Sequence, residues 1–69
     1  MGKKIREYKG DMEPTSEQFR ECYRVCSELT NMFLSVHLVR LDKRTGEVYI
    51  LAGDGLQVLI RPNGKVRYP

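Results

Sequence analysis

Two cysteines and one histidine are the side chains of this chain whose chemistry could support catalysis or metal binding. Cys22 and Cys26 are four residues apart, a spacing that on a helix holds the two Cβ atoms about 5–6 Å apart. A disulfide needs about 3.5–4.5 Å between those atoms, so we expect no bridge between the two. A metal site needs further ligands, and His37 is the only histidine. We therefore predict two core thiols in a reducing compartment, with no metal and no cofactor.

His37 is also the candidate for a general base. Catalysis by a nucleophile and a base requires a hydroxyl or thiol beside the imidazole and an acid that orients it. Ser35 and Asp42 are near in sequence, but they form no recognised motif with His37. Gly53-Asp54-Gly55 is too short for a phosphate-binding loop and opens no helix. We expect a packed His37 and no catalytic residue.

A group of cations around Tyr49 could bind single-stranded RNA through phosphate contacts and stacking. The cations are Arg40, Arg61, Lys65 and Arg67. The chain lacks the aromatic signature of RNA-recognition domains. Its formal charge of +3 resides in residues 1–10, and the acidic and basic side chains of residues 11–69 balance. Nucleic acid is therefore the weaker of the partner classes.

The elements that position these residues begin with a helix. Thr15 and Gln18 have the spacing of a capping box, which predicts a helix from about Ser16 to Asn31 or slightly beyond. An apolar stripe of helical period is expected to face the core. It comprises Phe19, Cys22, Tyr23, Cys26, Leu29, Thr30 and Phe33. The charged side chains lie mostly opposite, with Glu17–Arg20, Glu21–Arg24 and Arg24–Glu28 as expected ion pairs.

Residues 36–68 alternate apolar and polar side chains in four short segments: 36–41, 47–52, 56–61 and 65–68. The first turn suits Gly46 in the left-handed region, and the second sets Ala52 opposite Leu56. In the third, Pro62 favours a type I turn with a bulge at Gly64. The predicted fold class is α+β: one N-terminal helix packed on a four-stranded antiparallel β-meander in the order 1-2-3-4.

The predicted registers give the sheet two faces that both carry large apolar residues. The inward face is expected to carry His37, Val39, Leu41, Val48, Ile50, Ala52, Leu56, Val58, Ile60, Val66 and Tyr68, whereas Val36 falls on the other face. That other face, here called the outward sheet face, has an apolar centre of Leu38, Tyr49, Leu51 and Leu59, and a rim of Arg40, Arg61, Lys65 and Arg67. An antiparallel sheet usually keeps a wet face polar, so an apolar centre inside a polar rim indicates an interface.

We therefore predict a small non-enzymatic protein-interaction module that uses the outward sheet face, either as a homodimer or with a small protein partner. In one alternative, Ile5 and Tyr8 of the N-terminal segment fold back over this face. In a second, the protein is a toxin–antitoxin-type component that binds or cleaves RNA, with His37 acting beside Arg40 and Arg61.

The chain divides into residues 1–12, a basic N-terminal arm or extension, and residues 13–69, a single domain. No stretch approaches the roughly 18 apolar residues of a membrane span. The N-terminus lacks the apolar run of a signal peptide. We expect a cytoplasmic protein with no membrane partner.

Several short motifs carry a resemblance over about residues 12–68. They are Glu13-Pro14-Thr15, the Cys22 and Cys26 pair, Leu29-Thr30-Asn31, Val36-His37-Leu38-Val39-Arg40-Leu41-Asp42, Thr45-Gly46 and Ile50-Leu51-Ala52-Gly53. With these motifs the chain resembles a small family of uncharacterised proteins found mainly in cyanobacteria. The resemblance implies no activity and transfers no site residue. It implies a cytoplasmic setting and, by analogy with two-gene toxin–antitoxin pairs, a small partner encoded nearby.

Overall fold

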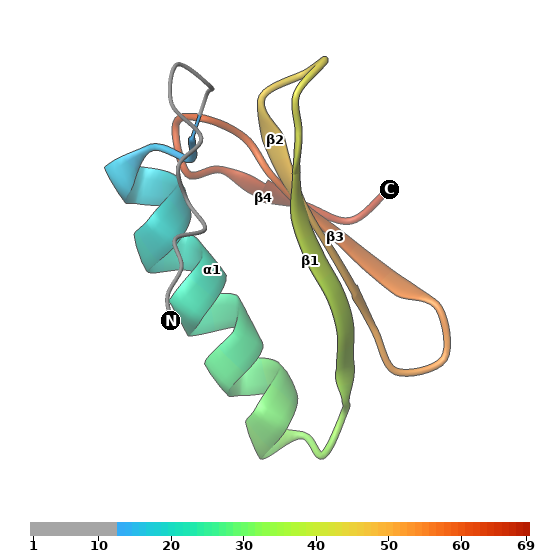
Figure 1. The fold of residues 1–69 in the computed structure, drawn as a ribbon. Helices are drawn as coiled ribbons and strands as arrows, with labels where there is room; N and C mark the ends of the chain where they lie inside the picture. The colour runs from blue at the N-terminus through green and yellow to red at the C-terminus, as the bar shows by residue number, and fades with distance from the viewer. Residues whose placement is uncertain (1–12) are drawn as a thin grey trace, which may run out of the picture.

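The computed structural model describes residues 13–69, one helix followed by four strands (Figure 1). They are α1 (Ser16–Asn31), β1 (Val36–Asp42), β2 (Glu47–Ala52), β3 (Leu56–Ile60) and β4 (Val66–Arg67). The strands form one antiparallel sheet in the order β1-β2-β3-β4, which confirms the predicted α+β meander. The basic arm, with Ile5 and Tyr8, lies outside the described residues.

Both ends of α1 are fixed by local hydrogen bonds. At the start, Gln18 N donates to Thr15 Oγ1 and Thr15 N donates to Gln18 Oε1, which confirms the predicted capping box. At the end, Leu34 N donates to Leu29 O and Phe33 N donates to Thr30 O, both at 2.9 Å. This pair of bonds is a Schellman motif, and Phe33 holds its left-handed position with φ of 62°.

The three turns set the predicted registers. Leu41 pairs with Val48 across a turn in which Gly46 has φ of 77° and donates to Asp42 O. The second and third turns pair Ala52 with Leu56 and Ile60 with Val66, as expected. Tyr68 was expected in the fourth strand, but β4 ends at Arg67 and Tyr68 is exposed.

One irregularity in β1 corrects the predicted faces of two residues. The register shifts between Val36, which pairs with Ala52, and Leu38, which pairs with Leu51. The extra residue is His37, so Val36 packs against the core and His37 is exposed. The expectation of an outward Val36 and a packed inward His37 was wrong because a β-bulge reverses the alternation before it.

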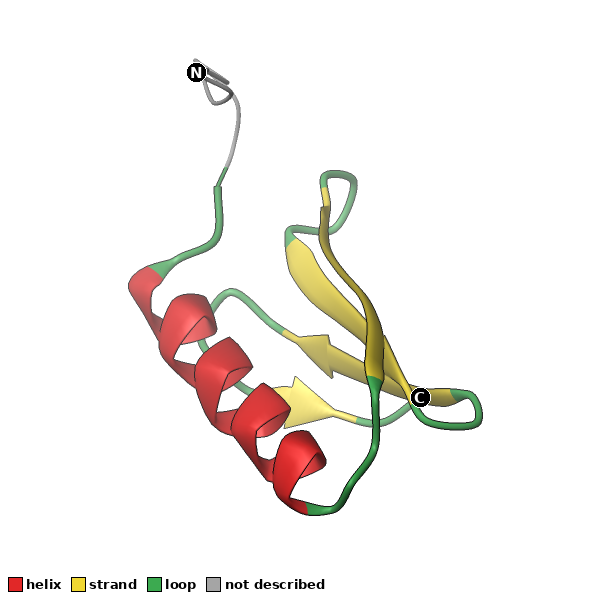
Figure 2. Cartoon of the chain, turned by 60° about the horizontal axis from the view of Figure 1, so that its bottom comes forward, coloured by secondary structure: helices red, strands yellow, loops and turns green. Residues whose placement is uncertain are grey.

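The core lies between α1 and one face of the sheet, and Figure 2 shows the helix covering that face alone. Ile50, Ala52, Val58 and Ile60 are fully buried there. Their helix partners are Val25 and Leu29, with Cys22 and Cys26 packed at the margin. Val39 faces the same side but stays 45% exposed, so the helix leaves part of β1 uncovered.

The helix stripe predicted from the sequence is confirmed for Cys22, Cys26 and Leu29, which pack in or against the core, and was wrong for its other four members. The buried positions of α1 are Gln18, Val25 and Leu29, whereas Phe19, Tyr23, Thr30 and Phe33 are exposed. Gln18 explains which side of α1 faces the sheet. Its side-chain amide donates to Gly46 O at 2.7 Å and to Ile60 O at 2.9 Å. These bonds hold the start of α1 with Gln18 facing the sheet, so Phe19 turns away.

Candidate functional site

The outward sheet face is built from two cross-strand rows. In one row, Leu38 lies opposite Leu51, which lies opposite Gln57. In the other, Arg40 lies opposite Tyr49, Tyr49 opposite Leu59, and Leu59 opposite Arg67. The structure therefore brings together Leu38, Tyr49, Leu51 and Leu59. No element within residues 13–69 covers them, since α1 lies on the other face.

The apolar centre of this face is shallow. Leu38 on the edge strand is 38% exposed, and Tyr49, Leu51 and Leu59 are half-buried by the side chains beside them. Contact with a further protein surface would remove the remaining apolar area from water.

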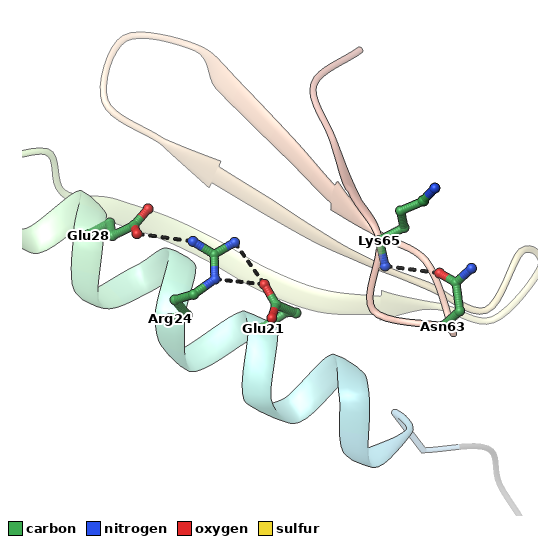
Figure 3. Close-up of polar contacts among 5 residues, drawn as sticks. All are labelled: Glu21, Arg24, Glu28, Asn63 and Lys65. Carbon is green, nitrogen blue, oxygen red and sulfur yellow. Dashed lines mark hydrogen bonds and ion pairs between the residues drawn. The ribbon is translucent and has the colours of Figure 1, made fainter.

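Cations stand at both ends of the Arg40–Tyr49–Leu59–Arg67 row. Arg67 lies 3.5 Å from a carboxylate oxygen of Glu47 and is partly neutralised by it. Within residues 13–69, Arg40, Arg61 and Lys65 form no side-chain ion pair. Figure 3 shows the ammonium group of Lys65 reaching away from its turn, where its backbone N–H donates to Asn63 Oδ1. The rim is therefore a set of exposed cations.

The helix α1, on the other face of the sheet, carries three acids and two arginines. Arg24 lies between Glu21 and Glu28, at 2.7 and 3.0 Å from their carboxylate oxygens (Figure 3). These two pairs were predicted. The third expected pair, Glu17–Arg20, does not form among the described residues. The helix thus has a slight excess of acid, whereas on the outward sheet face the cations Arg40, Arg61, Lys65 and Arg67 outnumber Glu47.

A second apolar surface was missed in the sequence. Phe19, Tyr23 and Phe33 are 57%, 75% and 95% exposed. With Cys26 and Thr30, which lie between them along the helix, they form what we call the aromatic flank of α1. The signal that could have revealed it is the recurrence of Gln18, Cys22, Val25 and Leu29 at i, i+4, i+7 and i+11, a second stripe in competition with the aromatic one.

The aromatic flank lies on the β1 side of the helix. The side of the helix that carries Glu17 faces the turn between β3 and β4, because a Cβ added to Gly64 in that turn would lie 3.0 Å from the Cβ of Glu17. Phe19 and Tyr23 lie on the other side of the buried stripe, toward the opposite edge of the sheet.

The two cysteines are free thiols, as predicted, and both pack at the margin of the core. The pKa of the Cys22 thiol is raised from 9.0 to about 11, mainly by burial and to a lesser extent by the neighbouring Cys26. The thiolate is the form that attacks or binds metal, so the high pKa makes Cys22 a poor nucleophile at neutral pH.

The single histidine, His37, hydrogen-bonds to the turn between β2 and β3. His37 Nε2 hydrogen-bonds to Gly53 O at 2.9 Å, and Gly53 N donates to Ser35 O. These contacts hold the turn between β2 and β3 against the segment that precedes β1. The bulge is what directs the imidazole to this turn.

Comparison with known proteins gives one match. A family model described as "Domain of unknown function (DUF6888)" matches residues 13–67. No curated protein and no solved structure matches the chain. In the part of the chain that the structure describes, no helix is long and apolar enough to cross a membrane.

Proposed function

The chain belongs to the DUF6888 family, a domain of unknown function, and we propose that it works as a small non-enzymatic protein-interaction module through the outward sheet face. The observation that carries the proposal is the row in which Arg40 and Arg67 flank Tyr49 and Leu59. Apolar side chains in the centre supply burial, and cations at both edges supply orientation.

The geometry of this row indicates the chemistry of the partner. Arg40 and Arg67 lie on the two edge strands, three strand spacings or about 14 Å apart. An α-helix about 10–12 Å in diameter fits between them. Carboxylates beside its apolar stripe would reach the cations on either edge. The proposed partner segment is therefore an acidic amphipathic helix.

A second copy of the chain fits this face less well. A two-fold pairing would bring Arg40, Arg61 and Lys65 of one copy against the same cations of the other. Like charges at an interface oppose association, and burying them unpaired is costly. The homodimer expected from the sequence is therefore assigned to a different surface, which is argued below.

A titration with two synthetic peptides tests the proposal. One peptide has a leucine stripe flanked by glutamates over about four helical turns, and its control has lysines in place of the glutamates. The acidic peptide should shift the backbone amide NMR signals of Leu38, Tyr49, Leu51 and Leu59, and salt should weaken the effect. The lysine peptide should not bind. The proposal fails if the acidic peptide binds elsewhere, or binds a Leu51→Glu variant equally well.

A truncation distinguishes partner binding from the alternative in which the N-terminal arm folds back over the outward sheet face. Residues 1–12 lie outside the described residues, and their removal leaves the whole helix and sheet. If the arm covers the outward sheet face, its removal should strengthen peptide binding. Unchanged binding leaves the face open to a partner.

A cytoplasmic location, a cyanobacterial setting and a small partner encoded nearby are parts of the same proposal, expected from the thiols and from the resemblance described above. An RNA-binding or RNA-cleaving toxin–antitoxin component is the competing function. The contact of His37 with Gly53 O gives the imidazole a role in the fold, and this favours the interaction module.

A further inference from the structure

We propose that the aromatic flank of α1 is a self-association surface, on which a second copy of this chain packs its own α1 antiparallel to the first. This proposal is independent of partner binding by the outward sheet face. It begins from the exposure of Phe19, Tyr23 and Phe33 at 57%, 75% and 95%. Scattered exposed apolar residues are ordinary, but rings gathered along one side of a helix mark an interaction site.

The flank is continuous along the helix. At 3.6 residues per turn, Phe19, Tyr23, Cys26 and Thr30 lie within an arc of roughly 60°. That arc is centred about 100° round the helix from the buried stripe of Gln18, Val25 and Leu29. Phe33 follows at the end of the helix, where its backbone N–H donates to Thr30 O. The result is an apolar strip that runs the length of α1.

The order of side chains in the strip makes it complementary to itself. The large rings of Phe19 and Tyr23 lie in its first half, and the smaller Cys26 and Thr30 lie in its second. An antiparallel pairing with the two-fold axis between Tyr23 and Cys26 sets Tyr23 of one copy against Cys26 of the other. It likewise sets Phe19 against Thr30. Each ring then meets a small side chain, as close helix packing requires.

Charge permits this pairing. The acids of α1, Glu17, Glu21 and Glu28, lie on the opposite flank of the helix or beside it. The strip itself carries no ionisable carboxylate or cation. Two copies can therefore approach along it without the repulsion that opposes self-pairing of the outward sheet face.

The available area indicates a weak dimer. Three rings of roughly 200 Å² each, at their observed exposures, offer roughly 450 Å² per copy. A standard interface buries about 800 Å² per partner. The rings supply more than half of that, so the interface is smaller than the standard one. We expect a dissociation constant on the order of 10–100 µM.

Phe33 adds a separate observation. Its φ of 62° is a left-handed conformation that glycine adopts readily and a phenylalanine adopts at a cost. The ring gains nothing from the fold of one copy, because it is 95% exposed. A strained residue with an exposed ring is consistent with a contact made outside the single chain.

Sedimentation equilibrium of the full chain between about 5 µM and about 1 mM tests the proposal. The wild type and Tyr23→Phe should dimerise alike. Tyr23→Glu should raise the dissociation constant at least about thirtyfold, the effect of losing an interface hot spot. Tyr23 is 75% exposed, so the variant should keep its fold, which circular dichroism checks.

Two further variants make the outcome decisive. Leu51→Glu, on the outward sheet face, should leave the dimer intact. Phe33→Gly should make the single chain more stable to urea and yet weaken the dimer about tenfold. A monomeric wild type over the whole range overturns the proposal, as does a dimer that survives Tyr23→Glu. A dimer lost only in Leu51→Glu would move self-association to the outward sheet face. Tyr23→Glu should still bind the acidic peptide, which keeps the two proposals separable.

Discussion

The side-chain amide of Gln18 donates a hydrogen bond to the carbonyl oxygen of Ile60, 42 residues later, at 2.9 Å. The same nitrogen donates to Gly46 O at 2.7 Å, and Thr15 Oγ1 donates to Pro62 O close by. One fully buried amide thus joins the start of the helix to the end of β3 and to the turn between β1 and β2. The angle at which α1 crosses the sheet is fixed there.

Gln18→Glu is the isosteric test of this junction. The carboxylate can still accept from Thr15 N, but it cannot donate to Gly46 O and Ile60 O, which are left facing a buried negative charge. We expect a loss of about 2–4 kcal/mol in the free energy of unfolding at pH 7, measured by urea denaturation. Lowering the pH should restore part of it, because a protonated carboxyl donates one bond. Ser16→Ala, at an exposed neighbour, is the control, and an equal loss in both variants would contradict the assignment.

Phe33→Gly should stabilise the fold. Glycine adopts a φ of 62° without the steric cost that phenylalanine bears, and the expected gain is about 1 kcal/mol at concentrations where the chain is monomeric. Met32→Gly is the matched control. Met32 has φ of −92°, which any residue adopts, so glycine there should cost about 0.5–1 kcal/mol. A loss of stability in both variants would show that the left-handed strain is not the deciding effect.

Alkaline pH should destabilise the fold through Cys22. Burial raises the pKa of this thiol from 9.0 to about 11, so the folded state holds the proton more tightly than the unfolded chain does. The resulting stability is fully present below pH 9 and is lost as the pH rises from 9 toward 11. Urea denaturation of the wild type and of Cys22→Ala across this range should show a shallower decline in the variant. Parallel declines would mean that other groups cause the alkaline loss.

His37→Ala distinguishes the two functional classes. The imidazole hydrogen bond to Gly53 O is exposed, so its removal should cost no more than about 1 kcal/mol and should leave peptide binding unchanged. The wild type should not cleave single-stranded RNA in a direct incubation. If expression of the wild type arrests growth and His37→Ala relieves the arrest, the RNA-cleaving alternative replaces the interaction module.

The features predicted correctly are those that local chemistry decides. The capping box at Thr15, the left-handed Gly46 and the bulged turn at Gly64 each depend on a few consecutive residues, and together they set the strand order and the registers. The outward sheet face followed from those registers, and its apolar centre is where the sequence placed it.

The rest depended on contacts between distant residues. Two apolar stripes compete on α1, and the one that is buried holds both Gln18, bonded to Gly46 O and Ile60 O, and the core residues Val25 and Leu29. Both stripes have helical spacing, so periodicity alone does not choose between them, and Phe19 and Tyr23 were assigned to the core. The bulge at His37 was likewise hidden, because the residues on both sides of it still alternate.

The bulge near the start of β1 has a consequence for solubility. β1 is the longer of the two edge strands, and the unpaired backbone groups of a straight edge offer a template to which further strands can add without limit. The shift between Val36 and Leu38 breaks the even spacing of that edge, and Arg40 adds a charge to it. A regular chain of added strands cannot continue past such a break. The edge of the sheet is thereby protected from fibrous growth, while the outward sheet face and the aromatic flank of α1 stay exposed for the contacts proposed above.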